Sequence, residues 1–112
     1  MKEFLMLIRE NANYGELSPA EMHADIQEHM VWIESLVEKG HFKAGNPLEA
    51  RGTVVKGDLI TDGPFVETKE CVSGYYFILA ASLEEATEIA KGCPDLKRGS
   101  ILEIREIMLM DE

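Results

Sequence analysis

The stretch YYFILAASLEE, residues 75–85, joins a strand signal to a helix signal with almost nothing between them. Residues 75–80 are all apolar or aromatic, a pattern typical of a strand that is covered on both faces. Ser82 and Glu85 then stand at the N-cap and N3 positions of a helix, which Gly92 is expected to end. The segment therefore predicts a buried strand that leads directly into a helix.

The same pair of signals occurs once more, near the start of the chain. Phe4-Leu5-Met6-Leu7-Ile8 is a second apolar run. Ser18-Pro19-Ala20-Glu21 then combines an N-cap, a proline at the first helical position and a capping-box glutamate, and Gly40 is expected to end the helix. Apolar residues at three- and four-residue spacing predict one stripe of this helix that faces the sheet: Met22, Ile26, Met30, Ile33, Leu36 and Val37.

The remaining strands complete the pattern of a known architecture. Residues 42–45 predict one short strand, and residues 52–56 with 59–60 predict an irregular hairpin. Residues 101–109 predict the last strand. The order is β-α-β-β-α-β with an extra hairpin. It predicts a single α+β domain over residues 1–112, of the ferredoxin-like type, with an antiparallel sheet and both helices on one face.

The predicted strands are too apolar for a sheet that has helices on only one face. Such strands should alternate apolar and polar residues, yet residues 4–8 and 75–80 are apolar throughout and residues 101–109 are mostly so. A symmetric partner is the simplest cover for the second face. We therefore predict a homodimer whose sheets pack face to face, with pockets at the rim. The alternative is a monomer with an unusually apolar sheet face.

Composition excludes several classes of function. The chain has 112 residues and a net charge of -10, and its longest basic cluster is Lys97-Arg98, so nucleic acids and anionic membrane surfaces should be repelled. No apolar stretch approaches the ~20 residues needed to span a bilayer. Cys71 and Cys93 lack a metal-ligand spacing, and no signal peptide is apparent. We expect a cytoplasmic protein with free thiols and without a cofactor.

The first predicted helix carries a candidate acid or base. Asp25, His29 and Trp32 form an i, i+4, i+7 row at the border of the apolar stripe. A half-buried imidazole beside a carboxylate can act as a general acid or base. The carboxylate raises its pKa and burial lowers it, so the pKa stays near neutrality. Alternatively, His29 is a packed residue that bonds Asp25. His23, His29 and His41 lack the spacing of a ligand pair, so no metal site is predicted.

The segment TDGPFVETKE, residues 61–70, predicts a rigid turn followed by a charged cluster. Asp62 can bond the backbone ahead of it, Gly63 adopts dihedral angles that are closed to other residues, and Pro64 fixes φ. A turn of this kind would aim Phe65 and the cluster in defined directions. Alternatively, it is a surface turn with solvated charges.

Matching segments run through nearly the whole chain: DGPFVETKE at 62–70, Gly74-Tyr75-Tyr76, Ser82-Leu83-Glu84-Glu85-Ala86, Cys93-Pro94, Gly99 and Glu103-Ile104-Arg105. Together they resemble the DGPF-domain branch of the YCII-related protein family. The resemblance implies a small cytoplasmic protein with the ferredoxin-like fold of the dimeric α/β barrel superfamily. It also implies an active site, in which a histidine on the first helix pairs with an aspartate at the end of the first strand. His29 matches that histidine, but Ile8-Arg9-Glu10-Asn11 contains no aspartate, so the partner would be Glu10, Asp25 or Asp62.

Two classes of function follow. In the first, the chain is a small-molecule enzyme of the lyase or isomerase type, with His29 as acid or base and Asp62 or Asp25 orienting it. Its expected substrate-binding residues are Trp32, Phe65, Glu67, Lys69, Glu70 and Arg105, of which Lys69 or Arg105 would hold an anionic group. In the second, the chain is a non-catalytic dimeric ligand-binding or regulatory module, and the 61–70 segment is a structural latch with an apolar anchor and matched charges.

Overall fold

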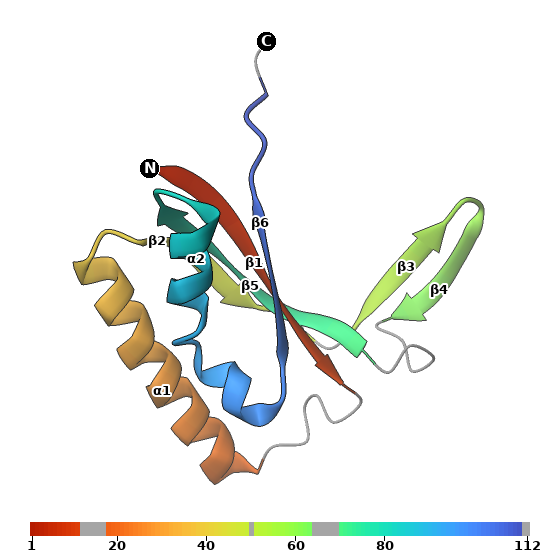
Figure 1. The fold of residues 1–112 in the computed structure, drawn as a ribbon. Helices are drawn as coiled ribbons and strands as arrows, with labels where there is room; N and C mark the ends of the chain where they lie inside the picture. The colour runs from red at the N-terminus through yellow and green to blue at the C-terminus, as the bar shows by residue number, and fades with distance from the viewer. Residues whose placement is uncertain (12–17, 50, 64–69, 111–112) are drawn as a thin grey trace.

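The structure is a computed structural model that describes residues 1–11, 18–49, 51–63 and 70–110 (Figure 1). Its elements are, in chain order, β1 (Lys2–Asn11), α1 (Pro19–Glu38), β2 (Phe42–Pro47), β3 (Gly52–Lys56), β4 (Leu59–Gly63), β5 (Glu70–Ala80), α2 (Leu83–Ala90), the 3-10 helix η1 (Pro94–Arg98) and β6 (Ile101–Glu106). β2, β5, β1 and β6 form an antiparallel sheet in that order, and β3 pairs with β4. With the β3–β4 hairpin set aside, this is the ferredoxin-like order, so the predicted fold class is confirmed. Neither helix is long and apolar enough, in the part of the chain that is described, to span a membrane.

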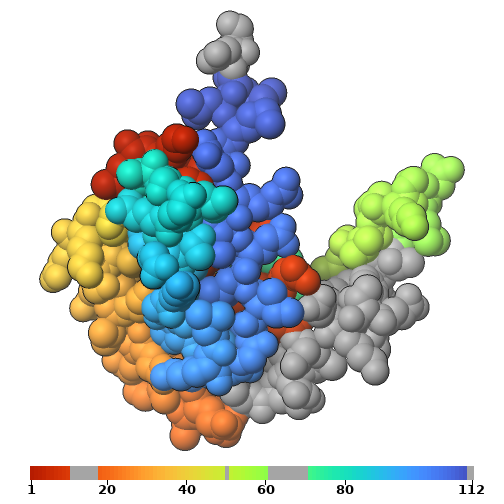
Figure 2. Space-filling view, viewed as in Figure 1, coloured from red at the N-terminus to blue at the C-terminus, as the bar shows by residue number. Residues whose placement is uncertain are grey.

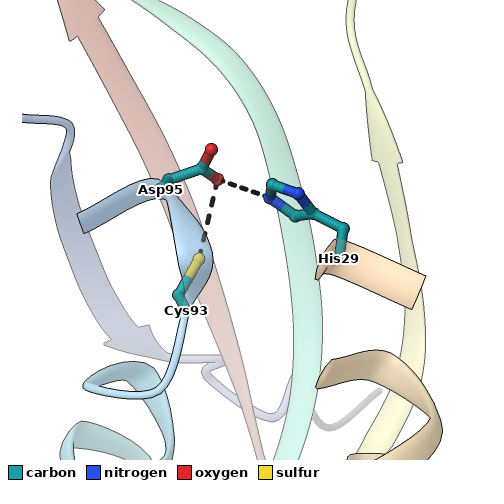
Figure 3. Close-up of side chains that lie close together, drawn as sticks. All are labelled: His29, Cys93 and Asp95. Carbon is teal, nitrogen blue, oxygen red and sulfur yellow. Dashed lines mark hydrogen bonds and ion pairs between the residues drawn. The ribbon is translucent and has the colours of Figure 1, made fainter. Parts of the chain in front are cut away.

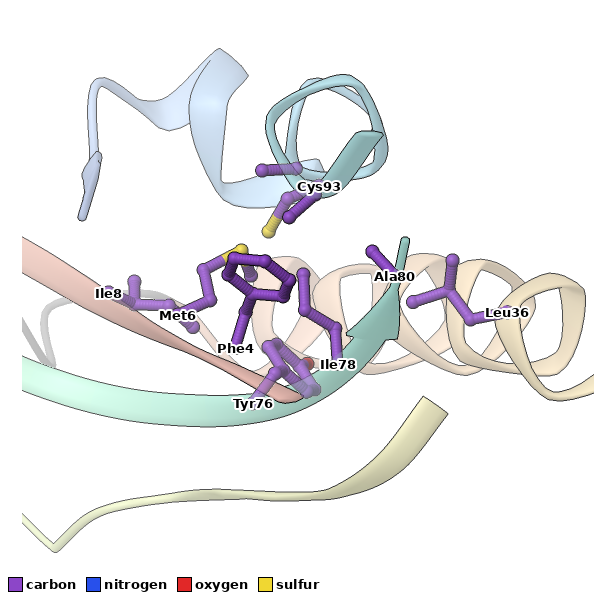
Figure 4. Close-up of a cluster of buried hydrophobic side chains, with 10 residues drawn as sticks. Phe4, Met6, Ile8, Leu36, Tyr76, Ile78, Ala80 and Cys93 are labelled. Carbon is purple, nitrogen blue, oxygen red and sulfur yellow. The ribbon is translucent and has the colours of Figure 1, made fainter. Parts of the chain in front are cut away.

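The core lies between one face of the sheet and the two helices (Figure 4). Phe4 of β1 and Ile78 of β5 are fully buried at its centre. Leu36 of α1 packs on the same cluster, as do Ala86 and Ala90 of α2. Because both helices contribute to one cluster, they cover the same face of the sheet, as the sequence predicts.

The predicted capping box at the start of α1 is present. Ser18 Oγ accepts a hydrogen bond from the backbone N–H of Glu21 at 3.1 Å, and Glu21 Oε1 accepts one from the backbone N–H of Ser18 at 3.0 Å. The helix ends at Glu38, and Gly40 follows with a φ of 75°, in the left-handed region that favours glycine. Both ends of α1 therefore lie where the sequence signals put them.

Replacing Ser18 by alanine should lower the free energy of unfolding by about 1 kcal/mol, because the backbone N–H of Glu21 loses its acceptor. Urea unfolding followed by circular dichroism measures the change. Ser35→Ala, within the same helix, is the matched control and should be neutral or slightly stabilising, since alanine is the better helix former. Equal losses in the two variants would argue against the cap.

Some strands differ in length from the prediction. β5 begins at Glu70, well before the apolar run, because its first residues still pair with β1, which extends to Asn11. β6 ends at Glu106, although the apolar pattern continues to residue 109. Backbone pairing therefore sets the ends of these strands, and side-chain polarity does not.

The second face of the sheet has an apolar centre that no described helix covers. Leu5 lies opposite Phe77 and Leu7 opposite Tyr75 on this face, and all four side chains are half-buried. Arg105 pairs with Leu5 from the neighbouring strand β6 and is exposed. This is the surface on which the homodimer prediction rests.

Candidate functional site

A cavity of about 710 Å³ lies between α1 and one end of the sheet. Volumes of this order are usual for sites that bind small molecules. Much of its wall is apolar, with side chains from α1 on one side and from β1, β2 and β5 on the other: Met22, Ile26, Met30, Ile33, Ile8, Pro47 and Tyr76. Gly45 of β2 also lines it, and a Cβ there would lie 2.3 Å from the ring of Tyr76, so this strand can approach β5 only with glycine.

The cavity corrects one expectation about α1. The apolar stripe was expected to face the sheet along its whole length, but within it only Leu36 is buried. Met22, Ile26 and Met30 stay 46%, 50% and 50% exposed, because they face the cavity instead of the sheet. Val37 is also exposed. The stripe therefore serves the core near its C-terminal end and the cavity wall elsewhere.

Charged side chains gather at one end of the cavity, around His29. His29 Nε2 lies 3.0 Å from Asp95 Oδ2 (Figure 3). Its Nδ1 lies 2.8 Å from the backbone oxygen of Asp25 and 3.2 Å from Asp25 Oδ1. Arg98 Nη1 lies 2.7 Å from the same Asp25 Oδ1, and Arg98 Nη2 lies 3.6 Å from Glu28 Oε1. These contacts join α1 to η1.

The loop between α2 and η1 places Asp95 beside His29. A Cβ on Gly92 would lie 2.9 Å from Trp32 Nε1, so the close approach of this loop to α1 depends on glycine. Cys93 follows and is buried, with its Sγ 3.6 Å from Asp95 Oδ2. η1 then ends at Gly99, which has a φ of 85°. One short turn between two glycines thus sets the position of the carboxylate.

Asp95 holds a proton on His29. The hydrogen bond to Asp95 is the main reason that the pKa of His29 rises from 6.5 to about 11. Hydrogen bonds with Cys93 and with the backbone of Asp25 act in the same direction, whereas burial opposes them. At neutral pH the ring is an imidazolium that donates from both nitrogens. The pKa of His29 is therefore higher than the near-neutral value expected from the sequence. The difference arises because that expectation did not include Asp95.

This raised pKa should make stability depend on pH. The folded-state pKa exceeds the unfolded one, so the contribution of His29 is complete below about pH 6.5 and is lost as pH rises towards 11. Within that window the free energy of unfolding should fall by about 1.4 kcal/mol per pH unit, relative to His29→Gln. Urea unfolding of both proteins between about pH 7 and 9 tests this, and parallel pH profiles would contradict it.

The structure brings together some of the predicted site residues and separates others. Asp25 and His29 both line the cavity. Trp32 packs edge-on against Tyr76, with ring centroids 5.3 Å apart, and lies outside the cavity lining. Arg105 is on the opposite face of the sheet. Asp62 lies in β4 and Glu70 begins β5, but their side chains are not described. Outside the described residues lie Phe65, Glu67 and Lys69.

Cys93, Asp95 and Arg98 were not predicted as site residues. Asp95 is 66 positions away from His29 along the chain, so no local spacing connects the two. The available signals were the helix-starting proline after Cys93 and the basic pair that contains Arg98. Neither of them shows that this turn packs against the first helix.

His29, Cys93 and Asp95 form a group whose donor atoms lie within 4.8 Å of one another, a spacing that could hold a metal ion. A proton already explains the short contact in this group, since 3.0 Å between Nε2 and Oδ2 is a hydrogen-bond length. Burial also raises the pKa of the Cys93 thiol, which disfavours the thiolate that a metal would need. We therefore interpret the group as a hydrogen-bonded network.

Comparison with known proteins finds similarity to a family model, to a curated protein and to a solved structure. The family model described as "YCII-related domain" matches residues 3–111. A protein of Rhizobium meliloti (strain 1021), named as uncharacterized, is 52% identical over 33 residues, which cover 30% of this chain and 27% of that protein. The match thus spans about a quarter of that relative. The structure of 5-chloro-2-hydroxyhydroquinone dehydrochlorinase from Burkholderia phenoliruptrix AC1100, in complex with 2,5-dihydroxybenzoquinone, is similar with a TM-score of 0.46 and 20% identity, and covers 90% of each chain.

Proposed function

This chain belongs to the YCII-related domain family, and we propose that it is an enzyme of the lyase or isomerase type that moves a proton on a small organic molecule. The observation that carries the proposal is the pair of His29 and Asp95 at the charged end of a cavity with largely apolar walls. The pair places a proton donor and a proton acceptor 3.0 Å apart. Reactions of this type need both groups at one site. Within the family, the segment at 62–70 favours the DGPF branch.

In the proposed reaction His29 gives a proton and Asp95 takes one. A substrate carbonyl or hydroxyl at this end of the cavity would compete with Asp95 Oδ2 for the Nε2–H of His29 and receive that proton. The carboxylate of Asp95 would accept the proton that leaves the neighbouring carbon. Transfer of this proton from Asp95 to His29 then restores the imidazolium and the carboxylate. One proton is donated and one is accepted, so the enzyme ends each turnover unchanged.

Asp25 and Arg98 would act as positioning residues. The backbone oxygen of Asp25 accepts from Nδ1 and fixes the plane of the imidazole ring. The guanidinium of Arg98 pairs with the Asp25 carboxylate at 2.7 Å and compensates its charge. The sequence-based role of Asp62 stays a prediction. The same holds for the substrate-binding roles of Trp32, Phe65, Glu67, Lys69, Glu70 and Arg105.

We also propose that the enzyme is a cytoplasmic homodimer without bound nucleic acid or membrane. The apolar centre of the second sheet face supports the dimer, because half-buried side chains there, such as Leu5 and Phe77, would be covered by the same face of a partner. Cys71 and Cys93 are free thiols, as expected in a reducing compartment. A net charge of -10 disfavours phosphate backbones and anionic lipids.

One observation favours a second function, a non-catalytic ligand-binding or regulatory module. Both ring nitrogens of His29 already have acceptors on the protein, namely Asp25 and Asp95. Asp25 in turn is paired with Arg98. In this interpretation the charges form a structural clamp between α1 and η1, and the cavity binds a molecule that the protein does not change.

Hydrogen–deuterium exchange on small molecules separates the two functions. The protein is incubated in D₂O with a panel of ketones, 2-oxo acids and hydroxyquinones, and proton NMR follows loss of the exchangeable C–H signal. An enzyme should exchange at least one compound, and His29→Gln and Asp95→Asn should each abolish that exchange. Glu38→Gln, at an exposed residue of α1, makes the same carboxylate-to-amide change and is the matched control for the second variant. Exchange that persists in both site variants would show that His29 and Asp95 do not take part in the reaction. Binding of a compound without exchange would favour the non-catalytic module.

A further inference from the structure

The β3–β4 hairpin stands away from the body of the molecule (Figures 1 and 2). It exposes aliphatic side chains on both of its faces. Every residue from 51 to 60 is exposed. Val55 and Ile60 lie opposite each other on one face and are 65% and 67% exposed. On the other face Val54 is 44% exposed and Leu59 is 60% exposed. These side chains therefore stay largely open to solvent in the single chain.

A hairpin of this composition is expected to have a partner. An isolated two-stranded hairpin is at best marginally stable in water, and contiguous apolar surface on a soluble chain usually marks an interaction site. The charged residues of the hairpin, Gly52–Gly63, are Lys56, Asp58 and Asp62. The hairpin thus carries a single net negative charge, on a chain whose net charge is -10. An apolar surface poor in charge is typical of the centre of a protein–protein interface.

We propose that this hairpin is a dimer arm that packs against a second copy of the same chain, an inference that rests on the proposed homodimer. The hairpin begins after β2 and leads into β5, which are neighbouring strands of the main sheet. A copy seated on the open face of that sheet would therefore lie beside the base of the hairpin. In a twofold dimer each arm meets the other copy in the same way, so the contact forms twice and the assembly closes.

The length of the arm suits this role. A five-residue antiparallel strand spans about 17 Å, and β3 and β4 each have five residues. The shortest dimension of the molecule is 18 Å. The arm is therefore long enough to extend across the thickness of the second copy, with Val55 and Ile60 on one face along the way.

The test is the dimer affinity of an arm variant, measured by sedimentation across a range of protein concentrations. Val55→Ser combined with Ile60→Ser removes the more exposed apolar face of the arm, and should raise the dimer dissociation constant about 100-fold. Val31→Ser combined with Val37→Ser is the matched control, since both residues are exposed valines, on α1. This control should change the dimer dissociation constant by less than about threefold relative to the wild type. Circular dichroism of each variant shows whether the body of the protein still folds.

A second measurement keeps the inference testable if the arm variant loses its hairpin. Amide hydrogen exchange of β3 and β4 in the wild type should become slower as protein concentration rises into the dimeric range. The arm proposal would be wrong if the arm variant dimerised with unchanged affinity and amide exchange in the wild type did not depend on protein concentration. That result would leave the sheet-face dimer and the enzyme proposal intact. A wild type that is monomeric throughout would overturn both the dimer and the arm. Tetramers that the arm variant reduces to dimers would also overturn it, because the arm would then join dimers to one another.

Discussion

Replacing Asp95 by asparagine should lower the free energy of unfolding at neutral pH by about 3 kcal/mol. The side chain of Asp95 is 10% exposed and that of His29 is 16% exposed, so the change removes a charged partner from a largely buried imidazolium. Removing one member of such a pair is costly because the other must either keep its charge in a poorly solvated site or give up its proton. The pKa of His29 should fall towards its ordinary value of 6.5, since the hydrogen bond to Asp95 is the main cause of its rise.

Two measurements check this prediction together. Urea unfolding gives the change in stability, and histidine side-chain NMR at several pH values gives the pKa of His29. Glu38→Gln makes the same carboxylate-to-amide change at an exposed residue of α1 and should alter the free energy of unfolding by less than about 0.5 kcal/mol. If Asp95→Asn behaved like this control while His29 stayed protonated above about pH 9, Asp95 would not be the group that holds the proton.

Replacing Phe77 by glutamate should convert the proposed homodimer into a folded monomer, with a rise of about 1000-fold in the dissociation constant. Phe77 lies on the open face of the sheet, opposite Leu5 and edge-on to Tyr75, with ring centroids 5.6 Å apart. A twofold interface would bury two new carboxylates within a largely apolar surface, which is costly. The core on the other face, around Ile78, should stay intact.

Light scattering and sedimentation of wild type and variant measure this effect. Val31→Glu introduces the same charge on α1, at a residue that is 66% exposed, and should leave the dimer unchanged. Circular dichroism must show that Phe77→Glu keeps native secondary structure. A variant that remains dimeric at the lowest measurable concentration would exclude this face of the sheet as the interface.

Much of the fold could be predicted from the sequence because the signals for it are local. The capping box at Ser18 and the glycine at position 40 act within one helical turn, and both stand where α1 begins and ends. The apolar runs at residues 4–8 and 75–80 each identify a central strand of the sheet. The 3-10 helix η1 was not predicted, because a short turn after a proline has no periodic pattern of its own.

Only the part of the candidate site that depends on local signals could be predicted from the sequence. His29 and Asp25 are four residues apart on one helix, so helical geometry alone brings them together. Asp95 reaches His29 across a distance in sequence that no pattern spans. Its approach depends on the contact of Gly92 with Trp32, which is a matter of packing between two separate segments.

Local sequence patterns are enough to identify the order of the helices and strands, the ends of the first helix and one candidate histidine, because each depends on neighbouring residues. The folded chain alone shows that Asp95 is the partner of this histidine, that the pKa of His29 rises to about 11, and that part of the apolar stripe on α1 lines a cavity. These properties depend on distances between segments far apart in the chain. Hydrogen bonding and burial, which set proton affinity and exposure, follow from those distances.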